Sequence, residues 1–197
     1  MTIIHGPNFQ LKCDDMFSAQ GRWLSETIAA IPDLGDGTTI ELGWTLLRLI
    51  AEGDVLLVHE PNFDGNAKSE TRFDVTASLK AILVQSEFMK LGQEAALPTR
   101  FDDKVVLRKG CLNAEALYGE RSVPSRGDSG WYFGPRGEAG PPGMQDLEAI
   151  WAYELVAARP ELLAPLVLPA GWLVLYDGAD LAAVVNASNE KVWPRDV

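Results

Sequence analysis

A polar turn runs into a short aromatic strand in the stretch Gly127-Asp128-Ser129-Gly130-Trp131-Tyr132-Phe133. Glycine on both sides of Asp128-Ser129 is typical of a turn, in which a carboxylate accepts backbone N–H groups. The large apolar indole of Trp131 suits the protein core. We therefore expect Asp128, Ser129, Gly130 and Trp131 to be a structural motif that holds the second half of the chain together.

The sequence around this stretch predicts short strands and helices. Asn113 can cap a helix that runs through Tyr118, and Asp146 can open a helix whose apolar residues recur at helical spacing. Pro160 suits the first position of a further short helix. Apolar runs predict strands, and clusters of polar residues, Gly and Pro predict loops. The expected strands lie at 105–107, 131–133, 172–176 and 182–185, and the expected loops at 122–128 and 134–143.

The first half of the chain predicts a β-α-β-β-α unit, by the same periodicities and by turn residues such as Asp36-Gly37 and Pro32. Its expected elements are an extended segment at 3–11, a helix at 14–31, a strand at 38–50 that forms a hairpin with 55–58, and a helix from about 71 to 92. Leu97-Pro98-Thr99 predicts a junction. We expect an N-terminal extension over residues 1–98 and a second domain over 99–197.

These elements predict an α+β fold class, with two compact α/β halves whose small mixed or antiparallel sheets pack against helices. Hydrophobic residues make up 47% of the 197 residues, which is enough for a buried core. The N-terminus carries neither a basic segment nor a long apolar run, and no stretch has the roughly 18 apolar residues of a membrane span. We therefore expect a cytoplasmic protein that does not enter membranes.

The formal net charge is −11, which disfavours direct binding to nucleic acid and favours a basic protein partner. Residues 14–64 carry a net charge of −8, and residues 138–190 carry −7. These acidic zones are either contact surfaces or solvated faces that confer solubility. The tryptophans of the second half also have two possible roles, as core residues or as anchors of an interface. They are Trp131, Trp151 and Trp172.

Enzyme chemistry finds little support in the sequence. Gly127-Asp128-Ser129-Gly130 is similar to the loop around the nucleophile of trypsin-like proteases, but a nucleophilic serine needs a base, and neither His5 nor His59 has a matching context. The histidines, with Cys13 and Cys111, show no metal-ligand spacing, and no phosphate-binding glycine motif is present. We therefore expect no catalytic residues, no metal and no cofactor.

The second half resembles a known family in the order of its segments. Val105-Val106-Leu107 is followed by Tyr118 with Arg121, then by Asp128-Ser129-Gly130-Trp131, a Gly-rich loop and the step Leu168-Pro169-Ala170-Gly171 before an apolar strand. This pattern over residues 100–195 resembles the immunity protein 33 domain, formerly a domain of unknown function. The resemblance implies a bacterial immunity protein that is encoded beside a polymorphic toxin of the kind that type VI secretion delivers. Such a protein binds its toxin 1:1 and catalyses no reaction.

Charge suggests which toxin such a protein would block. A nuclease cleft is lined with Lys and Arg, so an acidic inhibitor can occlude it in place of the phosphates, which favours a DNase. Because loops on a rigid scaffold are the usual contact elements, we expect partner contacts from Glu60 and Asp64, and from Arg136, Glu138 and Asp146. Two alternatives remain: a small hydrolase that uses buried carboxylates, and a regulatory scaffold that binds a ligand or peptide between its halves.

Overall fold

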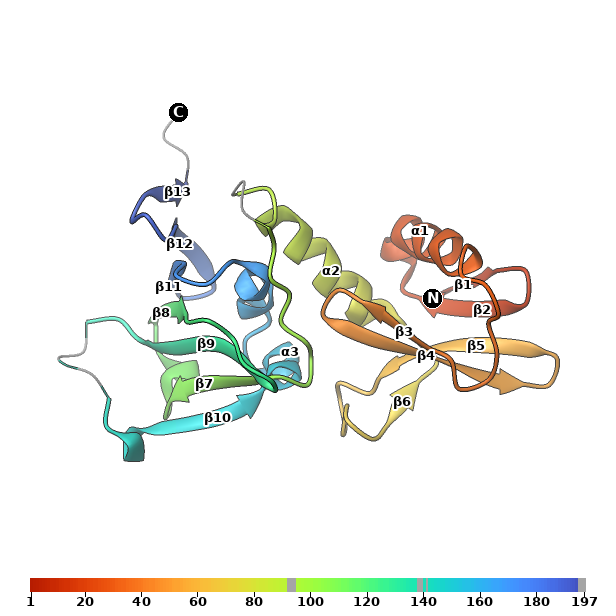
Figure 1. The fold of residues 1–197 in the computed structure, drawn as a ribbon, viewed down its shortest axis with the longest axis horizontal. Helices are drawn as coiled ribbons and strands as arrows, with labels where there is room; N and C mark the ends of the chain where they lie inside the picture. The colour runs from red at the N-terminus through yellow and green to blue at the C-terminus, as the bar shows by residue number, and fades with distance from the viewer. Residues whose placement is uncertain (92–94, 138–139, 141, 195–197) are drawn as a thin grey trace. The chain divides into compact units, whose positions relative to one another are not determined.

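The chain forms two mixed β-sheets and several helices (Figure 1). The computed structural model describes residues 1–91, 95–137, 140 and 142–194. The chain divides into unit 1, Met1–Leu83, and unit 2, Val84–Val197, and this division falls inside a helix. The predicted α+β class is confirmed. The domain boundary after residue 98 stays a prediction. Within the described ranges, no helix has both the length and the apolar character of a membrane span.

Unit 1 holds a six-stranded sheet in the order β1-β2-β5-β4-β3, with β6 paired to β5 (Figure 1). Neighbouring strands are antiparallel except for β2 and β5. The elements are β1 (Thr2–His5), β2 (Phe9–Cys13), α1 (Ser18–Ala29), β3 (Thr39–Leu42), β4 (Thr45–Glu52), β5 (Val55–Pro61), β6 (Thr71–Arg72) and α2 (Thr76–Phe88), the last of which continues into unit 2.

The predicted helix after Asp14 is confirmed as a 3-10 turn, η1 (Asp15–Phe17), followed by α1. The Asp14 carboxylate accepts a hydrogen bond from the Met16 N–H at 2.9 Å, which satisfies a backbone donor at the helix start. Helix α1 lies close to the sheet at Gly21, where an added Cβ would come within 2.9 Å of Cys13 Sγ. The unit's core combines residues of α1, the sheet and the start of α2, namely Phe9, Leu11, Cys13, Phe17, Leu24, Ile28, Ile40, Leu47, Leu49, Val58, Val75 and Leu79.

Two segments of unit 1 differ from the prediction in the number of strands. The extended segment at 3–11 is two antiparallel strands, β1 and β2, with a turn between them. The single strand expected at 38–50 is the hairpin of β3 and β4, because Gly43 adopts a positive φ of 58° and reverses the chain. The predicted hairpin with the segment at 55–58 is confirmed as β4 and β5.

Unit 2 holds a seven-stranded sheet in the order β10-β7-β9-β8-β11-β12-β13, in which only β7 and β9 are parallel. The strands are β7 (Lys104–Arg108), β8 (Ala116–Arg121), β9 (Asp128–Pro135), β10 (Leu147–Trp151), β11 (Leu173–Asp177), β12 (Asp180–Val185) and β13 (Lys191–Trp193). The short helices are η2 (Cys111–Asn113), η3 (Met144–Asp146), η4 (Ala152–Glu154), α3 (Leu155–Ala158) and η5 (Pro160–Val167).

The helix η5, which begins at Pro160 as predicted, is tied to the sheet by hydrogen bonds. The Tyr176 hydroxyl on β11 donates to the Glu161 carbonyl at 3.1 Å, and Arg121 on β8 donates to the Leu166 carbonyl. The core of the unit includes Val105, Leu107, Leu117, Trp131, Phe133, Leu155, Leu162, Leu166, Trp172, Val174, Tyr176 and Val184.

Two predicted helices of unit 2 are strands. The segment expected as a helix from Asn113 through Tyr118 begins at the last residue of η2 and runs into β8, which pairs with β9 and β11 in the middle of the sheet. The helix expected from Asp146 to Leu155 is instead β10 over its first part, which covers the edge of β7, and it becomes helical only in η4 and α3. Sheet neighbours far away in sequence supply the backbone partners in both cases, and this outweighs local helix signals.

Candidate partner-binding surface

A buried charge network at the end of β5 links two of the predicted contact residues. Glu60 lies opposite Arg72 in the β5–β6 pair, and its Oε1 accepts hydrogen bonds from Arg72 Nε at 3.1 Å and Nη2 at 2.9 Å. Its Oε2 accepts the Ser78 N–H at 2.8 Å, in the first turn of α2. The carboxylate thus meets the positive end of the helix and a guanidinium together.

Glu60 has no exposed surface, so the structure gives it a role inside unit 1. Arg72 connects this buried carboxylate to the surface. Its Nη1 donates to the carboxylate of Asp64, whose side chain is 76% exposed. The loop around Asp64 is closed by the Asn62 N–H, which donates to the Glu70 carbonyl at 2.9 Å. Of the two predicted contacts here, Asp64 is the one that presents a carboxylate to solvent.

Burial raises the pKa of Glu60, because a carboxylate removed from water is less easily charged. Hydrogen bonds from Ser78 and the charge of Arg72 act in the opposite direction and keep the anion partly compensated. A buried carboxylate with this many donors holds the start of α2 and the loop of Asp64 in place.

In unit 2 the Asp128–Trp131 motif surrounds the buried side chain of Arg121. Arg121 Nε donates to the Ser129 carbonyl at 3.0 Å, and its guanidinium lies over the Trp131 ring, 5.8 Å from the centroid. The same guanidinium bonds the backbone carbonyls of Leu97, Leu166 and Leu168 and the hydroxyl of Thr99. Burial lowers the pKa of Arg121 to about 10, which leaves it charged at neutral pH.

The motif's own residues shape the turn that leads to this cluster. Asp128 Oδ1 accepts the Gly130 N–H at 2.9 Å, and Ser129 Oγ donates to the Lys104 carbonyl at 2.7 Å. Gly130 has a φ of 75°, and an added Cβ would lie 2.3 Å from the Ser122 carbonyl oxygen. Trp131 is fully buried and stacks on Phe133, with ring centroids 5.3 Å apart. The arrangement explains why this stretch combines a short acid, a hydroxyl, a glycine and an indole.

Of the remaining predicted contacts, the two that the structure describes have separate local partners. Arg136 pairs with Asp177 at 2.8 Å, and both side chains are partly exposed. Asp146 is half-buried and accepts the Gly143 N–H at 3.0 Å, so its carboxylate serves the turn before β10. Glu138 lies outside the described residues.

The hydrogen bonds of Ser129 and His59 bear on the enzyme reading, in which these residues were candidates for a nucleophile and a base. Ser129 is buried, and its hydroxyl is bonded to two backbone groups, since it also accepts the Trp131 N–H at 3.1 Å. His59 on β5 lies 3.3 Å from the Thr71 hydroxyl, and burial lowers its pKa. Among the described residues, no three His, Cys, Asp or Glu side chains gather as metal ligands would.

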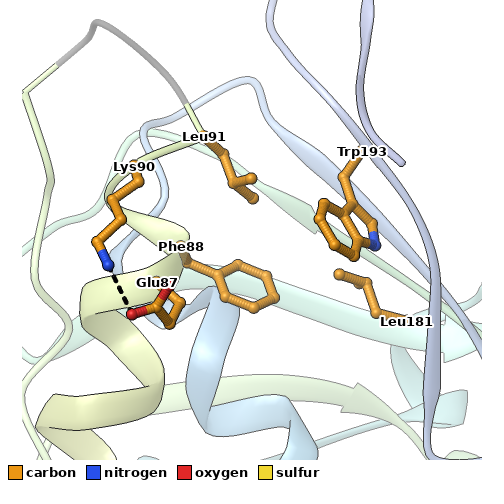
Figure 2. Close-up of a pocket in the computed structure, with 6 residues that line it drawn as sticks. All are labelled: Glu87, Phe88, Lys90, Leu91, Leu181 and Trp193. Atoms are coloured by element: carbon orange, nitrogen blue, oxygen red, sulfur yellow. Dashed lines mark hydrogen bonds and ion pairs between the residues drawn. The ribbon is translucent and has the colours of Figure 1, made fainter. Parts of the chain in front are cut away.

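An apolar groove in unit 2 has a volume of about 600 Å³. Phe88, Leu91, Leu181 and Trp193 face one another across it, and a Glu87–Lys90 ion pair of 2.6 Å lies at its side (Figure 2). The end of α2 is fixed within this unit because Gln85, itself buried, donates from Nε2 to the Leu163 carbonyl at 3.1 Å.

Sequence reasoning missed this groove. Its walls come from the end of α2, from β12 and from β13, which are separated by about a hundred residues and converge only in the fold. One local signal was present: Phe88 and Leu91 continue an apolar pattern past the part of α2 that fills the core of unit 1. That pattern predicts a second apolar contact for the helix, although it does not identify the other wall.

A family model described as the Imm33-like domain matches residues 84–193, which contain the Arg121 cluster and the apolar groove. No curated protein and no solved structure matches the chain.

Proposed function

Because the chain belongs to the Imm33-like family, we propose that it is an immunity protein that binds a cognate toxin and neutralises it. The match over residues 84–193 is the observation that carries this proposal, since it covers more than half of the chain. In this proposal the chain acts in the cytoplasm as a stoichiometric 1:1 inhibitor and transforms no substrate.

The net negative charge of the chain favours a basic toxin as its partner. We propose that this toxin is a nuclease, in particular a DNase effector of a type VI secretion system. A net charge of −11 attracts a cleft that is lined with Lys and Arg to hold a polyanion. The carboxylates of Asp64 and Glu70 are exposed on a loop that backbone hydrogen bonds and the Arg72 pair hold in place. Such a preordered acidic loop can occupy phosphate sites at a small entropic cost.

The test uses the purified toxin domain encoded beside this chain's gene, and measures its cleavage of plasmid DNA as the chain is titrated in. The proposal predicts complete inhibition at one equivalent. The double variant Asp64→Asn/Glu70→Gln should raise the concentration needed for inhibition, whereas Glu115→Gln, an exposed acid before β8, should leave it unchanged. Undiminished cleavage in the presence of excess chain would exclude a nuclease inhibitor.

A further inference from the structure

The loop of residues 62–70 in unit 1 is fixed at its base and on its inner side. Its two ends are joined where β5 pairs with β6. On the inner side, Phe63 is buried and stacks on Trp44, with ring centroids 5.1 Å apart. The backbone beside Asp64 is therefore held in place, but an exposed carboxylate can still adopt several side-chain conformations. A further contact is needed to fix its direction.

Arg72 makes this contact through the fork of its guanidinium. Its Nε and Nη2 both donate to Glu60 Oε1, while its Nη1 donates to the Asp64 carboxylate. Glu60 is fully buried and also accepts the Ser78 N–H at 2.8 Å, so it holds one side of the fork in place. Because a planar guanidinium keeps its donors at fixed angles, the buried bonds set the direction of the exposed one.

The charges of Glu60, Arg72 and Asp64 separate two ways in which Arg72 can affect binding. Arg72 is the positive member of the three, so its charge weakens the attraction that the loop exerts on a basic cleft. Any affinity that Arg72 adds for a basic toxin therefore comes from geometry and not from charge. A carboxylate that is already ordered loses less conformational freedom on binding than a free one does.

We propose that Arg72 is a positioning residue for toxin binding, which fixes the Asp64 carboxylate in the direction from which a Lys or Arg of the toxin's cleft receives it. This inference rests on the proposed immunity function. It goes further because it assigns a specificity-determining contact to unit 1, outside the residues 84–193 that the family model matches. The loop then distinguishes toxins by the placement of their basic side chains as well as by their charge.

The test measures binding of the full-length chain to a catalytically inactivated form of the toxin encoded beside its gene. Arg72→Lys keeps a cation beside the buried Glu60 and leaves the net charge unchanged, but a lysine ammonium lacks the fork that joins the two carboxylates. It should raise the Kd about 5-fold, which is the cost of ordering about one side chain at an interface. Arg22→Lys, at an exposed position of α1, is the matched control and should change the Kd by less than about twofold.

A double-mutant cycle with Asp64→Asn separates positioning from a purely structural role of Arg72. In the Asp64→Asn background there is no carboxylate to direct, so Arg72→Lys should change the Kd by less than about twofold. The same loss of affinity with and without Asp64→Asn would overturn the inference, and so would equal Kd values for Arg72→Lys and the wild type.

Asp64→Glu gives a second measurement at a position where folding is not at risk, because the side chain is exposed. It keeps the charge and moves the carboxylate by one methylene, and it should raise the Kd about 3-fold or more. An unchanged Kd would overturn the inference, while tight binding by the wild type keeps the proposed function. A wild-type chain that does not bind the toxin would overturn both.

Discussion

Replacement of Trp131 by alanine should destabilise the protein strongly, because this indole fills the centre of the Arg121 cluster. A fully buried tryptophan removes about 150–250 Å² from water, worth about 4–6 kcal/mol, and its stack on Phe133 adds about 1 kcal/mol. The Trp131 Nε1–H is buried without a hydrogen-bond partner among the described residues, so its removal relieves about 1–3 kcal/mol. The expected net loss is about 3–5 kcal/mol, as for other large-to-small core changes.

Urea unfolding followed by far-UV circular dichroism measures this loss, and hydrogen exchange of β8 and β9 localises it to unit 2. With a slope of about 2 kcal/mol/M, the midpoint should fall by about 2 M. Trp131→Phe is the control, since it keeps an aromatic ring against Phe133 and removes the unpartnered N–H. It should cost about 1–2 kcal/mol. If Trp131→Ala costs less than about 1 kcal/mol, the indole does not support the motif as described.

Three further outcomes are expected. Gly130→Ala should lower the free energy of unfolding by about 3 kcal/mol, measured by thermal or urea unfolding. Gly127→Ala should lower it by about 1 kcal/mol, because Gly127 has a similar φ of 77° but open space where a Cβ would lie. Equal costs would refute the close approach of Gly130 to the Ser122 carbonyl. Folding raises the pKa of Glu60. Between the ordinary glutamate pKa and this raised pKa, the folded chain therefore binds more protons than the unfolded chain. The free energy of unfolding should fall as the pH rises through that window. Glu60→Gln should lack this component when the two pH profiles of unfolding free energy are subtracted, and profiles of identical slope would contradict it. The association rate with the toxin, measured by stopped flow, should fall about 10-fold or more between about 0.05 and 0.5 M salt, and a rate independent of salt would remove the electrostatic argument.

Local signals predicted the parts of the fold that depend on local interactions. The helix that follows Asp14 and the hairpin of β4 and β5 have caps, turns and periodicities in neighbouring residues. The strands β8 and β10 were predicted as helices because their partners lie elsewhere in the chain. Asn113 and Asp146 are good helix-start residues, and each is instead the last residue of a 3-10 turn before a strand.

The candidate site shows the same division. The proximity of Asp64 to Glu60 followed from the sequence, but the arginine that joins them, Arg72, comes from a two-residue strand that no periodicity predicted. The role of Arg121 depends on backbone carbonyls of three distant segments, which only the folded chain brings together.

The most direct measurement is the survival of bacteria that express the toxin encoded beside this chain's gene, with and without the chain in the same cytoplasm. Neutralisation by binding predicts that co-expression restores growth and that the two proteins co-purify at a 1:1 ratio. Cells that die equally in both cases, or a purified chain that acts catalytically at far below one equivalent of toxin, would contradict it.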